Sequence, residues 1–185
     1  MNATVPGCVH TDLMDNKIIP DVYWGNNADS VKWIENKDWE YKTSFTADDK
    51  LMDREFIDLI FEGLDTYADV FVNETKVLEA SNMFTGYTVN VKPYISRGAN
   101  TLRIYFYSAV NKALPLYRAS NVKYPADNDD SETQVSVFTR KAAYQYGWDI
   151  APRMVGCGIW RPVKLEAWSG VKINSVSFKP VKITT

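Results

Sequence analysis

The residues of this chain that could act as nucleophiles or soft metal ligands are few and widely spaced. His10 is the only histidine and has no serine or cysteine nucleophile motif near it, so a catalytic triad is not indicated. Cys8 and Cys157 lack the C-x-x-C companion of zinc and thioredoxin-type sites. We interpret His10 as a structural hydrogen-bonding residue and the cysteines as buried free thiols, with a disulfide between them as the alternative. We expect no metal and no cofactor.

Carboxylates and aromatic rings are the other side chains that could recognise a ligand. The acidic run 127–132 lacks the glycine turn and the distant glutamate of an EF-hand, so we interpret it as a solvated loop. The chain has 6 Trp, 11 Tyr and 8 Phe, whose rings favour strands and sandwich cores and also stack on sugars. For Tyr23 and Trp24, packing is the favoured interpretation and a glycan platform is the alternative.

Length and charge exclude several classes of protein. A chain of 185 residues suits one domain, and it can bury a core without disulfides or a metal. Its formal charge of -2 comes from 21 basic and 23 acidic residues spread along the chain, whereas phosphate binding needs a concentrated basic face. No run approaches the ~18 apolar residues of a membrane span. We therefore expect no nucleic acid and no membrane as partners.

The hydrophobic pattern predicts an all-β domain. In residues 39–45, apolar and polar side chains alternate with the period of a strand that has one face in water. Only 28–36 has a helical pattern. Seven or more short strands, with turns about every ten residues, predict a sandwich or jelly roll. The predicted strands cover residues 39–45, 56–62, 67–72, 77–78, 87–91, 102–107, 160–168 and 171–178.

The stretch 108–151 differs from the rest of the chain. Pro115, Pro125 and the polar run 127–134 interrupt any regular period there. Loops of this length inside a compact domain are usually functional. We therefore expect a partner surface in this stretch.

Six sequence blocks, in order along the chain, carry a family resemblance. Together they resemble the opening domain of β-mannosidases in glycoside hydrolase family two. The last two are similar to the segment that separates β-mannosidases and their exo-glucosaminidase relatives from β-galactosidases. The blocks are 5–13 (VPGCVHTDL), 19–25 (IPDVYWG), 37–41 (KDWEY), 61–70 (FEGLDTYADV, followed by NMF at 82–84), 140–149 (RKAAYQYGWD) and 158–163 (GIWRPV).

The resemblance implies a galactose-binding-domain-like jelly-roll β-sandwich over residues 1–185. In the parent hydrolase, an immunoglobulin-like domain and a TIM barrel would follow it. Retention of configuration needs two carboxyls about 5 Å apart, and in the family both belong to the barrel, so we expect this chain alone to be inactive. Only residues 1–4 precede the first block. We therefore expect a sandwich that lacks an N-terminal strand and has an edge open to self-association.

The resemblance also implies a substrate-binding role for Trp148, Asp149 and Arg153 in the intact parent. The Trp-Asp pair of the family sits on a loop that reaches into the barrel's pocket, where a carboxylate binds sugar hydroxyls. The alternatives are packing for Trp148, a turn cap for Asp149 and a structural salt bridge for Arg153. The family continues Trp-Asp-Trp-Gly-Pro-Arg, whereas Ile150 and Ala151 stand here. Ile150 cannot stack on a sugar as Trp does. The resemblance therefore supports the family more strongly than it supports specificity for mannose.

Three functions remain open from the sequence. The first is an accessory domain that packs on the remaining domains of its own parent and helps to bind a β-mannoside-type glycan. The second is an autonomous carbohydrate-binding module. The third is a structural scaffold between domains. For the parent, the resemblance favours a periplasmic or secreted location.

Overall fold

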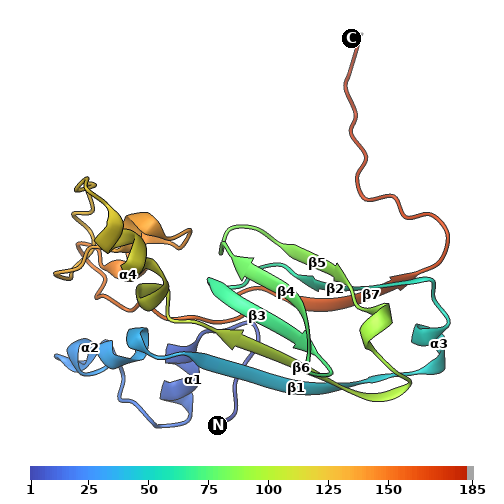
Figure 1. The fold of residues 1–185 in the computed structure, drawn as a ribbon, viewed down its shortest axis with the longest axis horizontal. Helices are drawn as coiled ribbons and strands as arrows, with labels where there is room; N and C mark the ends of the chain where they lie inside the picture. Colours follow the sequence, from blue (N-terminus) through green and yellow to red (C-terminus); the bar gives the residue numbers. More distant parts are fainter. Residues whose placement is uncertain (183–185) are drawn as a thin grey trace.

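The structure is a computed structural model that describes residues 1–182. It consists of two antiparallel sheets, with most of the helical segments at one end and α3 (Asp49–Met52) at the other (Figure 1). One sheet has the order β1-β6-β3-β4 and the other β5-β2-β7. This arrangement confirms the predicted β-sandwich. The strands are β1 (Trp39–Ala47), β2 (Phe56–Phe61), β3 (Tyr67–Val72), β4 (Thr75–Ser81), β5 (Tyr87–Asn90), β6 (Gly98–Phe106) and β7 (Val163–Trp168).

Alternation along the strands places one face of each sheet in the core. On β2, Ile57, Leu59 and Phe61 are buried, while the residues between them are half-buried. Their partners on β7 are Ala167, Leu165 and Val163, so these three also point inward. The core therefore lies between the sheets. It is completed from the first sheet by the buried side chains of Ala68, Val70, Val72, Ala80, Leu102, Ile104 and Phe106.

Helices occupy more of the chain than the sequence pattern predicted. Residues 28–36 do form helical turns, in α2 (Asn27–Ser30) and η1 (Lys32–Asn36), as predicted. The remaining helical elements are α1 (Val9–Asp15), α3 (Asp49–Met52), η2 (Lys92–Tyr94), α4 (Ala109–Ala119), η3 (Ser136–Phe138) and η4 (Ala143–Tyr146).

The interpretation of 108–151 as a continuous irregular loop was wrong at α4. The hydroxyl of Ser108 caps this helix by accepting a hydrogen bond from the backbone N–H of Asn111 at 3.0 Å. Val110 and Ala113 are buried in a second, smaller core with Tyr146 and Val155. Because tertiary packing stabilises most helices in proteins, α4 forms even though Pro115 lies inside it.

The predicted strand at 171–178 was also wrong. This segment has no β partner among the described residues, and Val171 and Phe178 are 93% and 90% exposed. Figure 1 shows it leaving the sandwich after β7 as an extended tail. The strand pattern is present in the sequence, but no neighbouring strand of the described chain completes it.

One edge of the three-stranded sheet agrees with the expected missing strand. Within residues 1–182, β7 pairs with β2 and with no other strand. Residues 1–8 form no strand. The outer edge of β7 is therefore unpaired.

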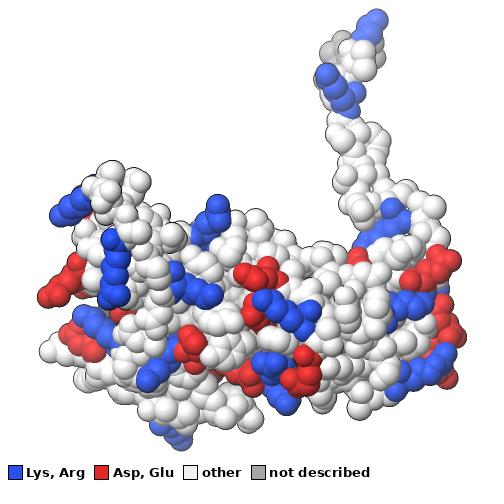
Figure 2. Space-filling model, viewed as in Figure 1, with Lys and Arg blue, Asp and Glu red and all other residues white. Residues whose placement is uncertain are grey.

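The surface carries both signs of charge. Figure 2 shows acidic and basic side chains interspersed over the visible face, as the even spread along the sequence predicted. None of the helices within residues 1–182 has the length and apolar character that crossing a membrane requires.

Candidate functional site

A hollow of about 900 Å³ lies in the segment where we expected a partner surface. Its rim contains an exposed indole and several carboxylates, and no lysine or arginine of the described residues lines it. The lining residues are Asp127, Asn128, Asp129, Asp130, Ser131, Glu132, Gln134, Gly147, Trp148, Asp149 and Ala151. Such a surface offers hydrogen-bond acceptors and one stacking face, and both suit a polyhydroxylated ring.

Trp148 and Asp149 belong to a tight turn at the edge of this hollow. The backbone N–H of Trp148 donates to the carbonyl of Ala151 at 3.0 Å, and the N–H of Ala151 donates back at 3.1 Å. Asp149 and Ile150 therefore form the tip of the turn, where Ile150 is 94% exposed. Trp148 is 60% exposed. The structure thus brings the predicted indole and carboxylate together on the surface.

Gly147 sets the direction from which the chain enters this turn. Its φ is +123°, and a Cβ atom there would lie 2.7 Å from the carbonyl oxygen of Asn128. Only glycine fits this backbone conformation and this close approach without strain. Ala151 has no such φ. The turn therefore accommodates alanine at the position where the family pattern has glycine.

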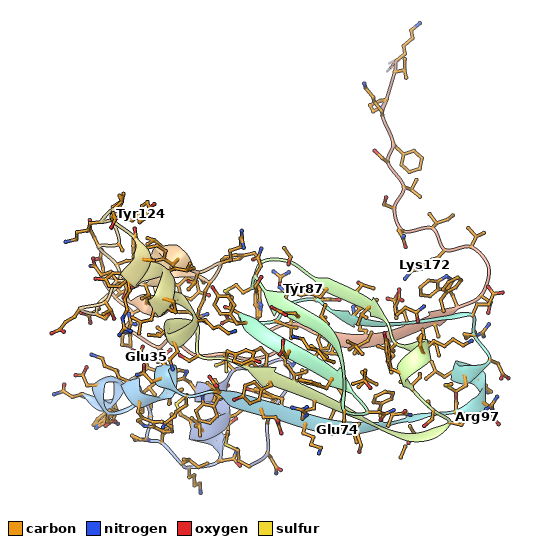
Figure 3. The ribbon with its side chains drawn as sticks, in the orientation of Figure 1. Glu35, Glu74, Tyr87, Arg97, Tyr124 and Lys172 are labelled. Carbon is orange, nitrogen blue, oxygen red and sulfur yellow. The ribbon has the colours of Figure 1, made fainter. Side chains whose placement is uncertain are left out.

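Arg153 lies behind the hollow rather than on its rim. Its side chain is 2% exposed, its Nε donates to Glu35 Oε2 at 2.8 Å, and its Nη1 donates to Asp129. Asp129 also accepts a hydrogen bond from the backbone N–H of Ser136 at 2.8 Å. This buried network ties three segments together at the helical end of the molecule, where Figure 3 labels Glu35. The structure therefore gives Arg153 carboxylate partners within the chain.

A second buried ion pair joins the same segment to the sandwich. Lys141 Nζ donates to Asp65 Oδ2 at 2.6 Å and to the carbonyl of Gly156 at 2.8 Å. Gln145 Nε2 donates to the same carboxylate oxygen at 2.9 Å, and Asp65 exchanges two backbone hydrogen bonds with Gly158. Two of the sequence blocks, 61–70 and 140–149, therefore meet here.

Sequence reasoning missed the residues that hold the site in place. Glu35, Asp65, Asp129 and Lys141 were not predicted as site residues. Lys141 and Asp65 are 76 positions apart, and nothing in their local pattern indicates that they pair. Their place inside the blocks 61–70 and 140–149 was the one available signal.

His10 lines a separate cavity of about 280 Å³, together with Cys8, Cys157 and Trp160. Burial, and secondly the charge of Lys141, lowers the pKa of His10 to about 4. The side chain of His10 is buried, with 6% of the residue exposed, and its role as a structural hydrogen-bonding residue stays a prediction.

The two cysteines are free thiols, so the disulfide alternative is wrong. Cys157 is buried, and burial raises the pKa of its thiol. Cys8 is half-buried rather than fully buried. Among residues 1–182, no group of three or more His, Cys, Asp or Glu side chains is arranged to hold a metal ion.

Comparison with known proteins gives the same family along most of the chain. Residues 1–161 match the family described as glycosyl hydrolase 2 galactose-binding domain-like. A β-mannosidase of Mus musculus is 34% identical over 185 residues, which cover 97% of this chain and 21% of the mouse protein. A β-mannosidase B of Thermothelomyces thermophilus is 37% identical over 164 residues, or 88% of this chain and 19% of that protein. The chain thus spans about a fifth of the length of these relatives.

Solved structures give the same picture. The crystal structure of a β-D-mannosidase from Dictyoglomus thermophilum superposes with a TM-score of 0.84 at 37% identity, covering 90% of this chain and 20% of that one. A structure of the exo-β-D-glucosaminidase CsxA has a TM-score of 0.63 at 20% identity, covering 90% of this chain and 17% of that one. The second likeness is one of fold. Both comparisons agree with the predicted galactose-binding-like sandwich.

Replacing Arg153 with Met should destabilise the chain by about 3–5 kcal/mol, because Asp129 and Glu35 would keep buried charges without a partner. Urea denaturation followed by tryptophan fluorescence measures this change. Arg97→Met is the control, since Arg97 pairs with Asp49 and Asp53 at the exposed opposite end and should cost at most about 1 kcal/mol. Equal effects would contradict a structural role for the buried network.

The lowered pKa of His10 predicts a loss of stability in mild acid. The unfolded chain takes up a proton below pH 6.5, whereas folded His10 resists protonation until about pH 4. Stability is therefore lost as the pH falls from 6.5 to 4, by about 2 kcal/mol at pH 5. Between pH 7 and pH 5, the free energy of unfolding of the wild type should therefore decrease by about 2 kcal/mol more than that of His10→Gln. Parallel pH profiles would refute the assignment.

Proposed function

This chain belongs to the galactose-binding-like domain family of glycosyl hydrolase 2 proteins, and from that premise we propose that it is the non-catalytic domain of a retaining β-mannosidase-like hydrolase. It packs on the catalytic barrel of its parent and contributes the turn 147–151 to the substrate pocket. The two catalytic carboxyls of a retaining mechanism belong to the barrel. Residues 1–185 then form a single domain of a larger protein, and the other domains of that protein are its partners.

The exposed turn that carries Trp148 and Asp149 is the observation behind this proposal. Both side chains lie at the rim of a hollow lined with hydrogen-bonding groups, and Trp148 is 60% exposed although large aromatic side chains usually pack inside. The indole offers a face for stacking on the apolar side of a sugar ring. The carboxylate accepts hydrogen bonds from hydroxyl groups. Together they suit a β-mannoside-type glycan whose reacting bond lies in the barrel.

Arg153 acts in this proposal as a positioning residue. Its guanidinium holds Asp129 on the hollow side and Glu35 on the other. It also lies four residues after Asp149 in the sequence, so it anchors the segment that follows the turn. A binding group has to be held within a fraction of an ångström of its productive position. A buried ion network under an exposed turn provides that rigidity.

A second candidate function, an autonomous carbohydrate-binding module, is favoured by a different pair of side chains. Tyr23 and Trp24 are 73% and 77% exposed, so the interpretation of these rings as packed residues was wrong for the described chain. Exposed aromatic rings are the usual stacking platforms for glycans. The module needs no barrel, and this separates the two functions experimentally.

Asp149→Ala in the longer protein that contains this domain should lower kcat/KM for a β-mannoside about ten- to hundredfold, because sugar hydroxyls would lose a charged acceptor. Asp53→Ala is the matched control, since Asp53 lies in an exposed ion pair away from the hollow. Its kcat/KM should stay within twofold, or about 0.4 kcal/mol. If kcat/KM of Asp149→Ala were unchanged, the proposed substrate contact would be wrong and the domain would be a structural scaffold only.

Titration of the isolated chain separates the accessory domain from the module. If the pocket requires the barrel, calorimetry with mannose, mannobiose and glucosamine should show no saturable heat. If the chain is a module, it should bind one of these sugars with a millimolar or lower dissociation constant, which corresponds to a binding free energy of about 4 kcal/mol or more. Loss of that binding in Trp24→Ala but not in Trp148→Ala would assign it to the platform of Tyr23 and Trp24.

A further inference from the structure

We propose that a cavity beside the hollow of Trp148 and Asp149 binds the leaving sugar of a β-manno-oligosaccharide. The inference rests on the proposed function, because it takes the hollow as the place of the mannosyl unit whose bond is cleaved. The cavity is formed by the end of α4, the loop after this helix, the acidic run and η3. Residues of this domain would then select substrates by what lies on the far side of the reacting bond.

The cavity has the size and the lining of a site for a small polar ligand. Its volume is about 510 Å³, and sites for small molecules usually have ~300–1,000 Å³ and combine aromatic walls with a few polar groups. Three aromatic side chains line it, those of Tyr117, Tyr124 and Phe138, together with the charged side chains of Arg118 and Lys123.

The cavity adjoins the hollow, because Glu132 and Gln134 line both of them. These two residues form a shared wall between the two spaces. A ligand that fills the hollow and continues past this wall enters the cavity. Adjacent sites of this kind suit a ligand made of successive similar units, and an oligosaccharide is such a ligand.

The buried network of Arg153 holds the shared wall in place. Asp129, which Arg153 binds, accepts a hydrogen bond from Ser131 Oγ at 3.1 Å through its carboxylate. The backbone carbonyl of Asp129 accepts a second one from Gln134 Nε2 at 3.5 Å. The same network lies beneath the turn 147–151. The two spaces therefore keep a fixed separation, as consecutive sugars of one ligand require.

The loop after α4 is shaped by its own hydrogen bonds. The backbone N–H of Ser120 donates to the carbonyl of Leu116 at 3.1 Å and ends the helix. The hydroxyl of Ser120 donates to the carbonyl of Val122 at 2.9 Å and accepts from the N–H of Val122 at 3.2 Å. The chain turns at this point, so Tyr124 comes to lie beside Phe138 of η3.

Tyr124 provides a supported ring with an exposed face. Its centroid lies 5.6 Å from that of Phe138 at an interplanar angle of 83°, and Phe138 in turn lies 6.2 Å from Tyr117 at 89°. Such edge-to-face contacts fix the orientation of aromatic rings. Tyr124 is nevertheless 47% exposed, and Figure 3 labels it at the helical end of the molecule. The ring is therefore suited to stack on the apolar face of a sugar.

The charged side chains of the cavity match hydroxyl groups. Arg118, Lys123 and Glu132 are all exposed and line it. The guanidinium and the ammonium donate hydrogen bonds, the carboxylate accepts them, and a sugar hydroxyl can do both. Figure 2 shows both signs of charge at this end of the molecule. A neutral sugar is the favoured occupant, because an acidic one would meet the carboxylate of Glu132 and those of the adjoining hollow.

Kinetic measurements on the longer protein that contains this domain test the proposal with two substrates. Mannobiose has a sugar as its leaving group, whereas the methoxy group of methyl β-mannoside is too small to fill the cavity. Tyr124→Ala should lower the ratio of kcat/KM for mannobiose to kcat/KM for methyl β-mannoside about tenfold, because only mannobiose loses a stacking contact. Tyr124→Phe keeps the ring, so the ratio should stay within about twofold of the wild type.

Two further variants make the test independent of Tyr124. Arg118→Gln removes a donor from an exposed position of the cavity and should lower the same ratio about three- to tenfold. Tyr94→Ala is the matched control, since Tyr94 is 39% exposed and lines neither the hollow nor the cavity. The ratio in this variant should equal that of the wild type.

Asp149→Ala separates the failure of this proposal from the failure of the proposed function. Asp149 contacts the mannosyl unit that both substrates share, so this variant should lower both values of kcat/KM and leave their ratio unchanged. If it does so while Tyr124→Ala leaves the ratio unchanged, the hollow contacts substrate and the cavity does not bind the leaving sugar. An equal loss for both substrates in Tyr124→Ala also overturns the proposal. If Asp149→Ala slows neither substrate, the proposed function is wrong and the assignment of the cavity falls with it.

Discussion

Lys141 places an ammonium group where its side chain has no exposure to water, and much of the irregular part of the molecule is arranged around that charge. Moving a charged group out of water costs several kcal/mol unless it is paired and hydrogen-bonded. Asp65 and the carbonyl of Gly156 meet this requirement, and Gln145 donates to the same carboxylate. The connection between β2 and β3, the block 140–149 and the chain before β7 therefore meet at one point. The buried ion pair of Lys141 and Asp65 thus holds together segments that have little regular structure, because each of them supplies one of its hydrogen-bonding partners.

The same principle operates one step further out, beneath the exposed turn. Arg153 binds Glu35 and Asp129, which come from the N-terminal helical segment and from the acidic run. The acidic run is thus only partly a solvated loop, because Asp129 is 3% exposed and serves the fold. The two buried networks leave Trp148 and Asp149 as the exposed end of a well-supported segment. This division between buried supporting charges and exposed side chains is the physical basis of our proposal that the turn contacts the substrate.

The strand-rich end shows the opposite situation, in which a requirement of the fold is left unmet by the described chain. A sandwich stabilises its sheets by covering the inner face of each, and β1 extends past the last strand of the facing sheet.

The sequence alone determined the all-β class and the family, because period-two alternation and ordered motifs are local properties of the chain. It also determined the turn of Trp148 and Asp149 as the candidate site, through the block 140–149. Only the tertiary structure decided that α4 is a helix, since its apolar face is stabilised by Tyr146 and Val155 from distant positions. It also decided that 171–178 is no strand, because a strand exists only where a neighbour pairs with it. The pairing of Asp65 with Lys141 likewise joins residues far apart in the chain, and the local sequence pattern around each residue does not predict it.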